Sequence, residues 1–425
     1  MKKMFATLAL ATALAANTMA QTEGTVLKVD LQTAVTDAVQ YNKQLQASTL
    51  DRETYYQKVR EARSAGLPQV SASLTGTTYF NKSLEFTEGM AIEMPNALTL
   101  AATASWTFSM QQIAGVKVAK IAQSLTDQTV KQTELDVKAN VTDTYYAVLV
   151  YERNMEILAD NLKDMQEIAE HTRHTYEVGA AEQTDVDQIN INVLTIQNSM
   201  YSLKRSLEST KRLLVLQMGI DINTQIETAE KLDDLLTPQA LSVSSDSLNI
   251  EENLEYKQLL LSKEVNEQTV KVRKYAYIPT LTAAYQYSNA LKGGFMNFDH
   301  VGSLTLTVPI FSGFQRHSQL KQAQIDVRKT ETNIALMEDN LQQNAEQYAF
   351  ELQTAVDAYN LQKENLEVAR RVLQNYRNKY DQGALSSLDL TQANTNYLSA
   401  ESSYATASLD VLTAITKLRK LYNDL

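Results

Sequence analysis

Two copies of one short segment hold the residues of this sequence that could do chemistry. Tyr176–Asn192 reads YEVGAAEQTDVDQININ and Tyr380–Asn396 reads YDQGALSSLDLTQANTN, with seven of seventeen positions identical. Each copy carries an Asp nine residues after its Tyr, Asp185 in the first and Asp389 in the second. Carboxylates attract cations, accept hydrogen bonds from hydroxyl groups and stabilise the first turn of a helix. The segment therefore predicts two equivalent places for charge and hydrogen bonding.

A glycine in each copy indicates how these side chains are positioned. Gly179 and Gly383 each follow a helical pattern, and glycine readily takes the left-handed conformation that ends a helix. A short polar step comes next, and Ser386 can cap the start of a second helix. We therefore expect helix–turn–helix tips at residues 176–188 and 380–392.

Long helices must carry these tips. Helical periodicity begins near Gln112 and continues to Gly179, which corresponds to a helix on the order of 100 Å long. The returning helix ends near Gly219, and the second hairpin runs to about Tyr422. Apolar residues at alternating spacings of three and four predict coiled-coil packing of both hairpins. These residues are Met155, Leu158, Leu162, Met165 and Ala169 in the first hairpin, and Leu366, Ala369, Leu373, Tyr376 and Tyr380 in the second.

Each hairpin is preceded by a helical pattern and then by a pair of alternating segments. Asp30 can cap a helix from Leu31 to about Ala65. Segments 68–80, 98–110, 279–290 and 301–311 alternate apolar residues with Ser and Thr, which predicts four strands, with a loop over about 81–96. Such alternation is typical of a membrane-spanning barrel wall, and also of a soluble sheet packed on helices.

Four strands cannot close a membrane barrel by themselves. Single-chain barrels begin at about eight strands, so several chains would have to share one barrel. Two chains would give eight strands with little bore, whereas three would give twelve strands and room for a channel. Aromatic residues near the strand ends fit the girdle of such a barrel. They are Tyr79, Phe80, Trp106, Phe108 and Phe311.

Composition excludes several classes of protein. The chain has no Cys and a formal net charge of −11, which excludes thiol catalysis and disfavours a nucleic-acid partner. Lys2, Lys3 and a short apolar run predict a signal peptide over residues 1–20, and no later stretch reaches eighteen apolar residues.

We find no GxSxG, P-loop, dinucleotide-binding or HExxH motif. The sequence predicts no enzyme, no catalytic residue, no cofactor and no metal site. His171 and His174 are interpreted as a solvated face.

The halves of the chain share one plan. We expect a first repeat over 21–220, a connector over 221–252 and a second repeat over 253–425. The chain resembles the TolC-like outer-membrane efflux proteins in this order of elements. The resemblance extends to the NxxL…LP pattern at Asn42–Pro68, the VPIFSG sequence at Val308–Gly313 and the YxxGxxxxxD pattern of the tips.

The resemblance implies a fold, an assembly and a function. The fold is mainly α, with a barrel of helical hairpins continuing a twelve-stranded outer-membrane β-barrel that a homotrimer shares, four strands per protomer. The function is that of a passive exit duct in a tripartite efflux or type I secretion system. A periplasmic adaptor and an inner-membrane transporter of the RND or ABC type would be its partners. The alternative from the residues is a periplasmic coiled-coil adaptor or scaffold without a pore.

The resemblance also assigns roles at the tips. Tyr380 matches a family Tyr that binds across to the Asp aligned with Asp185, and Asp389 matches one carboxylate of a ring that closes the periplasmic aperture. The second ring position is occupied by Gln392, and Asp187 is an additional acidic residue on the other hairpin. For these Asp residues, helix capping is the simpler role. Adaptor docking is expected at the turns, at Gly179, Ala180, Gly383 and Ala384.

Overall fold

The computed structural model describes residues 26–78, 80, 83–87, 90–93, 96–236, 248–293 and 299–425. The predicted signal peptide, the girdle residue Tyr79 and residues 237–247 of the connector lie outside these residues. The helices are α1 (Leu31–Tyr41), α2 (Lys43–Ser64), α3 (Met110–Glu177), α4 (Gln183–Met218), α5 (Leu232–Leu235), the 3-10 helix η1 (Ile250–Glu252), α7 (Leu254–Tyr275), α8 (Gln315–Asp381) and α9 (Ser387–Tyr422). The strands are β1 (Leu27–Val29), β2 (Gln69–Thr77), β3 (Ser83–Thr87), β4 (Met90–Glu93), β5 (Ala97–Phe108), β6 (Ile226–Thr228), β7 (Thr280–Lys292) and β8 (His300–Thr307).

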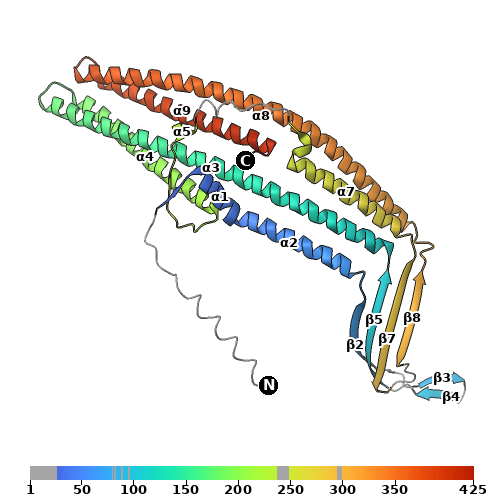
Figure 1. Cartoon of the computed structure of the whole chain (residues 1–425). Coiled ribbons are helices and arrows are strands. Elements are labelled where there is room, and N and C mark those ends of the chain that lie inside the picture. The colour runs from blue at the N-terminus through green and yellow to red at the C-terminus, as the bar shows by residue number, and fades with distance from the viewer. Residues whose placement is uncertain are drawn as a thin grey trace, which may run out of the picture. The chain divides into compact units, whose positions relative to one another are not determined.

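The chain divides into two compact units, and Figure 1 labels the helices and strands that they contain. The hairpin unit contains residues 1–42, 137–244 and 350–417, and therefore both tips. The sheet unit contains residues 43–136, 245–349 and 418–425, and therefore the long strands. Among the described residues, no helix combines the length and the apolar character that a membrane-spanning helix needs.

The sheet unit is built on four antiparallel strands in the order β2-β5-β7-β8. The register pairs Ala102 with Ala72 on one side and with Tyr287 on the other, and Ala101 with Ser73 and Ser288. Because successive side chains alternate across a strand, this register gathers the residues on two faces. The apolar face carries Val70, Ala72, Leu74, Leu100, Ala102, Ala104, Trp106, Phe108, Leu281, Ala283, Tyr285, Tyr287, Leu304 and Leu306. The hydroxyl face carries Ser71, Ser73, Thr75, Thr99, Thr103, Ser105, Thr107, Thr280, Thr282, Ser288, Ser303 and Thr305.

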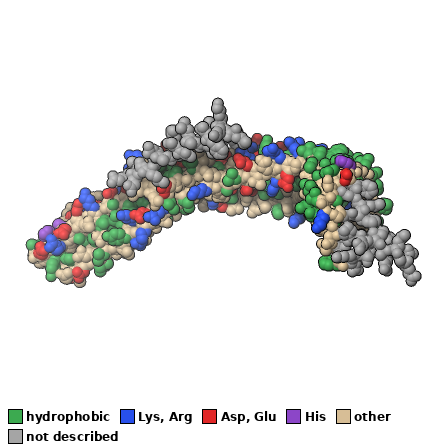
Figure 2. Space-filling view, turned by 90° about the horizontal axis from the view of Figure 1, so that it is seen from below, with side chains coloured by type: hydrophobic (Ala, Val, Ile, Leu, Met, Phe, Trp, Pro, Cys, Tyr) green, Lys and Arg blue, Asp and Glu red, His purple; other side chains and the backbone are tan. Residues whose placement is uncertain are grey.

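Large side chains of the apolar face are exposed in the single chain. Leu304 is 72% exposed and Leu74 is 61% exposed. Figure 2 shows hydrophobic side chains gathered over the sheet, at the right of the view. An exposed apolar surface of this kind marks a site of contact with lipid or protein.

Two groups of aromatic rings lie on the apolar face. The ring centroids of Trp106 and Phe108 are 6.2 Å apart, and Trp106 Nε1 donates a hydrogen bond of 2.9 Å to the carbonyl of Gly66. Nearer the other end of the sheet, the ring of His300 lies 5.2 Å from that of Tyr287, and its Nδ1 is 2.7 Å from the hydroxyl of Tyr285. This second group is absent from the predicted girdle, whereas the predicted Phe80 and Phe311 lie outside the strands and are exposed.

The strand ends follow local chemistry. β8 stops at Thr307, earlier than the predicted end at 311, because Pro309 has no N–H to continue a ladder. The predicted loop over 81–96 is wrong in part, because β3 and β4 form a short antiparallel pair within it. The predicted helix from Leu31 to Ala65 starts as expected, with the Asp30 carboxylate accepting from Thr33 N at 2.7 Å. It is interrupted at Asn42, which separates α1 from α2.

The same anchoring contact occurs in both halves of the chain. In the hairpin unit, Asn42 Nδ2 donates to the carbonyl of Gln217 at the end of α4, at 2.7 Å. In the sheet unit, Asn253 Nδ2 donates to the carbonyl of Leu421 at the end of α9, at 3.3 Å. Each asparagine therefore satisfies a carbonyl that the end of a returning helix would otherwise leave unpaired.

The core of the hairpin unit is shared by both hairpins. Met165, Ile168, Ile189, Ile196 and Leu390 are buried together, although they come from α3, α4 and α9. Members of both predicted seams pack against this cluster, which confirms the predicted coiled-coil packing near the tips. They are Leu158, Leu162, Ala169, Leu373, Tyr376 and Tyr380.

Candidate functional site at the hairpin tips

The two turns have the same backbone geometry. Gly179 has a φ of 77° and Gly383 a φ of 70°, both in the left-handed region. The glycine N–H bonds to the carbonyl of Tyr176 or Tyr380 at 2.8 Å, and the following Ala180 or Ala384 closes a longer bond at 2.9 Å. This pair of bonds is the Schellman motif, which ends a helix and reverses the chain. The Tyr, Gly and Ala residues recur in the sequence because both hairpins have the same type of turn.

Asp185 takes part in a helix cap and also joins the hairpins, whereas Asp389 supports a cap that Ser386 makes by accepting from the Asp389 N–H at 3.2 Å. Asp389 Oδ2 accepts from the Ser386 hydroxyl at 2.7 Å, next to the first turn of α9. Asp185 Oδ2 accepts from the Glu182 N–H at 3.2 Å at the start of α4. The other oxygen of Asp185 accepts from Ser387 Oγ on the second hairpin at 2.5 Å. Capping and a cross-hairpin contact therefore coexist in Asp185.

Tyr380 makes a second link between the hairpins, with a partner that the sequence did not indicate. Its hydroxyl lies 2.6 Å from Thr172 Oγ1. Thr172 donates its own hydrogen to the carbonyl of Ile168 at 2.8 Å, so Tyr380 is the donor between the two hydroxyls. Burial raises the pKa of Tyr380, with the charge of Asp185 contributing in the same direction, and this keeps the donor hydrogen in place. The expected Tyr380–Asp185 hydrogen bond is therefore wrong: the structure uses Tyr380–Thr172 and Ser387–Asp185 instead.

The remaining predicted aperture residues bond within their own helices. Asp187 Oδ1 accepts from Gln183 Nε2 at 2.9 Å on α4. Gln392 Nε2 donates to Asn396 Oδ1 at 3.0 Å on α9. Both side chains are exposed, and these hydrogen bonds do not join the hairpins.

Deeper in the hairpin unit, polar groups on α3 also pair with the second hairpin. Arg377 Nη1 lies 2.7 Å from Asp164, and its Nη2 lies 3.4 Å from Glu167. The buried amides of Asn161 and Asn394 exchange two hydrogen bonds, at 2.6 and 3.2 Å. Sequence patterns miss such pairs because Asn161 lies beside the seam position Leu162, and its partner depends on how the helices are rotated.

The buried amide pair gives a measurable stability effect. Asn394→Ala leaves Asn161 buried without its partner, which is expected to cost about 1–3 kcal/mol of unfolding free energy. Thermal or denaturant unfolding of the purified protein measures the change. Replacing both residues by Leu should recover part of the loss, because no unpaired amide then remains buried. A single variant as stable as the wild type would show that the pair does not hold the hairpins together.

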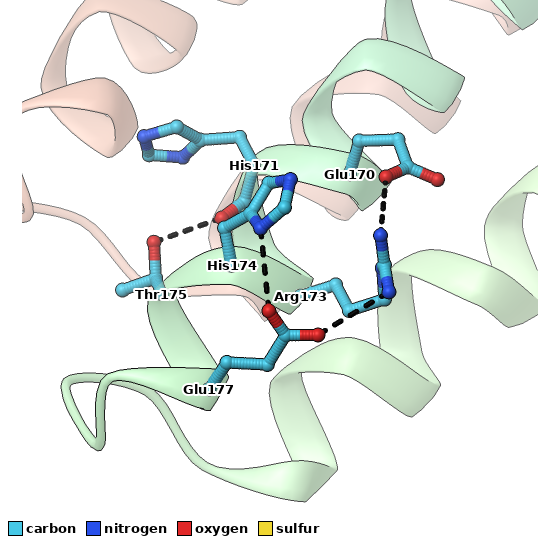
Figure 3. A network of polar contacts seen from close by, with 6 residues as sticks. All are labelled: Glu170, His171, Arg173, His174, Thr175 and Glu177. Atoms are coloured by element: carbon cyan, nitrogen blue, oxygen red, sulfur yellow. Dashed lines mark hydrogen bonds and ion pairs between the residues drawn. The ribbon is translucent and has the colours of Figure 1, made fainter.

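The last turns of α3 carry a charged network next to the first tip (Figure 3). Arg173 bridges Glu170 at 2.9 Å and Glu177 at 3.2 Å, and His174 Nδ1 lies 3.3 Å from the other oxygen of Glu177. The ring of His171 points away from Glu177. Over the part of the chain that the structure describes, no group of three or more His, Cys, Asp or Glu side chains is arranged to hold a metal ion.

Comparison with known proteins identifies the family to which the chain belongs. The family model for outer membrane efflux proteins matches residues 34–219 and 249–424, which is well over half of the chain. The chain belongs to the outer membrane efflux protein family. Its place is therefore the outer membrane, and the family is one of channels, which are not enzymes. Each matched stretch contains two of the long strands and one helical hairpin.

Known relatives of this outer membrane efflux protein are distant in sequence. It is 22% identical to outer membrane protein TolC of Salmonella enteritidis, over 86% of this chain and 76% of the relative. It is 21% identical to the toxin and drug export protein A of Aggregatibacter actinomycetemcomitans, over 86% of this chain and 80% of the relative.

Solved structures share the fold over nearly the whole chain. The Campylobacter jejuni CmeC outer membrane channel superposes with a TM-score of 0.78 at 17% identity, covering 93% of this chain and 85% of that one. CusC superposes with a TM-score of 0.76 at 14% identity, covering 95% of each chain. The similarity confirms the predicted channel fold and its mainly helical character.

Proposed function

We propose that three copies of this protein form one outer-membrane channel continuous with a periplasmic helical tunnel. The observation that carries this proposal is the open sheet, whose edge strands β2 and β8 have no further neighbour among the described residues. Unpaired backbone groups cannot face hydrocarbon, so β8 of one copy must pair with β2 of the next. Three copies close a twelve-stranded barrel with the apolar face toward lipid and the hydroxyl face toward the lumen.

The channel is the passive exit duct of a tripartite efflux or type I secretion system. Membership of an efflux family supports this role, and one relative is named for the export of toxin and drugs. An inner-membrane transporter of the RND or ABC type supplies the energy, and a periplasmic adaptor joins it to the channel. The matching turns at Gly179–Ala180 and Gly383–Ala384 present two equivalent ends on which a repeated adaptor surface can dock.

The tips form the gate of the tunnel. Tyr380–Thr172 and Ser387–Asp185 hold the two hairpins of one protomer together at this end. Threefold symmetry brings three copies of Asp389 and Asp187 toward one axis, where their charges repel one another and attract cations. Opening the gate requires the hairpin links to break.

The assembly is tested by isolating the protein from membranes. Outer-membrane fractions should contain an oligomer of three chains that resists SDS without heating, and the purified oligomer should conduct in planar bilayers. A soluble scaffold would instead leave the apolar face of the sheet in contact with water. Recovery of only single, water-soluble chains would overturn the proposal.

The orientation of the sheet is tested by two neighbouring alanines on β5. Ala102→Lys places a charge on the apolar face, which is expected to cost about 2–4 kcal/mol at the bilayer midplane and to reduce the amount assembled in the outer membrane. Ala101→Lys places the same charge on the hydroxyl face and should assemble normally. Quantifying the SDS-resistant oligomer for both variants decides the matter, and equal assembly of the two would contradict the assignment of the faces.

The aromatic girdle is proposed to consist of two belts. Trp106 and Phe108 mark the end of the sheet next to α3, and Phe311 follows β8 on the same side. Tyr285, Tyr287 and His300 mark the other belt. Amphipathic rings at these levels would anchor the barrel at the two membrane interfaces.

A further inference from the structure

The hydroxyl face of the sheet is built of small, uncharged side chains. Between its Ser and Thr residues, the register places mainly alanines on this face. Its remaining positions are Gln69, Thr77, Ala97, Ala101, Ala284, Gln286, Ala290, Val301 and Thr307. Charged residues make up 21% of the chain, so the neutrality of this face is a property of the sheet and not of the overall composition.

The basic side chains of the four strands lie on the opposite face. Lys292 pairs with Leu98, across an irregularity in the β5–β7 register, and His300 pairs with Tyr287. Both partners belong to the apolar face. Over the described residues of β2, β5, β7 and β8, no Asp, Glu, Lys or Arg therefore occupies a position on the hydroxyl face.

A wall of this composition has no means of sorting solutes by charge. Channels select ions with rings of charged side chains, carboxylates for cations and Lys or Arg for anions. A hydroxyl both donates and accepts hydrogen bonds, so Ser and Thr can solvate a solute of either sign. The same positions in these four strands hold no aromatic ring, on which a flat solute could stack.

We propose that the barrel section of the channel is charge-blind, so that it passes organic cations, organic anions and neutral molecules alike. This inference rests on the proposed function, because it needs the hydroxyl face to line the lumen. The sign of the cargo is then selected before the barrel, where Asp187 and Asp389 place negative charge at the tips. The barrel itself adds no selection by charge.

The test uses the fact that the chain has no Cys, because a single introduced thiol is then the only one. Ala101→Cys places this thiol on the hydroxyl face of β5, between Ser73 and Ser288. The purified full-length protein, in an uncharged detergent, is treated with two methanethiosulfonates of similar size. One carries a trimethylammonium group and the other a sulfonate. Mass spectrometry follows the rate of each reaction.

The readout is the ratio of the cationic to the anionic reaction rate, divided by the same ratio for 2-mercaptoethanol. This division removes the preference of any thiolate for the cationic reagent. We expect the normalised ratio for Ala101→Cys to lie within about threefold of one. At 0.15 M salt, charges farther away than about 8 Å are largely screened, so the ratio reports the wall near residue 101.

A second variant shows what a charged wall would do. Adding Ser73→Glu to Ala101→Cys places a carboxylate beside the thiol, and it should raise the normalised ratio about tenfold. The proposal is overturned if the ratio for Ala101→Cys alone departs from one by more than about threefold in either direction. It is also overturned if Ser73→Glu leaves the ratio unchanged, because fixed charge on this face would then not act on passing solutes.

Ala102→Cys is the matched control for the orientation of the sheet. This neighbouring residue lies on the apolar face, where detergent covers it, so it should react with neither reagent. If Ala101→Cys is unreactive, or if Ala102→Cys reacts as fast, the proposed channel fails and the charge-blind lumen fails with it. A protected Ala102→Cys together with a skewed ratio at Ala101→Cys overturns the charge-blind lumen alone.

Discussion

Single-channel conductance should rise several-fold in the double variant Thr172→Val and Ser387→Ala. These substitutions remove the two hydrogen bonds, of 2.6 and 2.5 Å, that join the hairpins at the tips. Each bond contributes about 1 kcal/mol, so each protomer would lose about 2 kcal/mol of closed-state stability. That loss shifts the closed–open equilibrium of a protomer by more than about tenfold. Planar-bilayer recording of the purified protein measures the effect.

Matched control variants distinguish the loss of the hydrogen bonds between the hairpins from a general destabilisation of the helices. Thr175 and Ser199 carry hydroxyls that bond only within their own helices, to the carbonyls of His171 and Thr195. Thr175→Val with Ser199→Ala should therefore leave the conductance unchanged. Removing the opposite partners, with Tyr380→Phe and Asp185→Ala, should open the channel as well, although Asp185→Ala also removes a helix cap. If the linked-pair variants conduct as the wild type does, the gate is held by other residues.

Gly219→Ala should destabilise the protein more than any other single Gly→Ala change at a helix end. Gly219 has a φ of 76°, and a Cβ built there would lie 2.1 Å from the carbonyl oxygen of Tyr41 and 2.8 Å from the amide nitrogen of Asn42. These are backbone atoms, so no side-chain rotation relieves the overlap. We expect a loss of about 3 kcal/mol or more from the clash and the left-handed strain together. The midpoint of denaturant unfolding and the amount of assembled protein measure it.

Gly383→Ala separates the two contributions. Its φ of 70° is nearly the same, but a Cβ there meets no other atom within 4 Å. Only the conformational strain of about 1 kcal/mol should remain. Equal unfolding midpoints for the two variants would show that the approach of α1 to the end of α4 is not as close as the structure describes.

The periodicity of apolar residues predicted the long helices and strands, because it shows which face of each helix or strand is buried or covered. The alternation of Leu98, Leu100 and Ala102 with Thr99 and Thr103 required a strand, and the register then placed these residues on opposite faces. Breaks that depend on distant contacts were missed. Nothing local marks Asn42 as the end of α1, because its amide bonds to Gln217, 175 residues away.

The site was predicted by residue type more successfully than by partner. Tyr380 and Asp185 do join the hairpins, yet their partners are Thr172 and Ser387. Thr172 is buried in α3 and resembles any threonine that bonds to a carbonyl one turn earlier, so the sequence alone gives it no distinguishing signal. The burial of Glu401 in α9 was missed for a related reason, because a single Glu in a long helix is usually solvated.

The parallel pairing of β1 with β6 sets an order on biogenesis. Leu27–Val29 pairs with Ile226–Thr228, and the N–H of Leu31 bonds to Glu230, 199 residues later in the chain. A polypeptide exported from its N-terminal end delivers β1 long before the partner strand leaves the cytoplasm. The earliest residues to arrive are therefore among the last to pair.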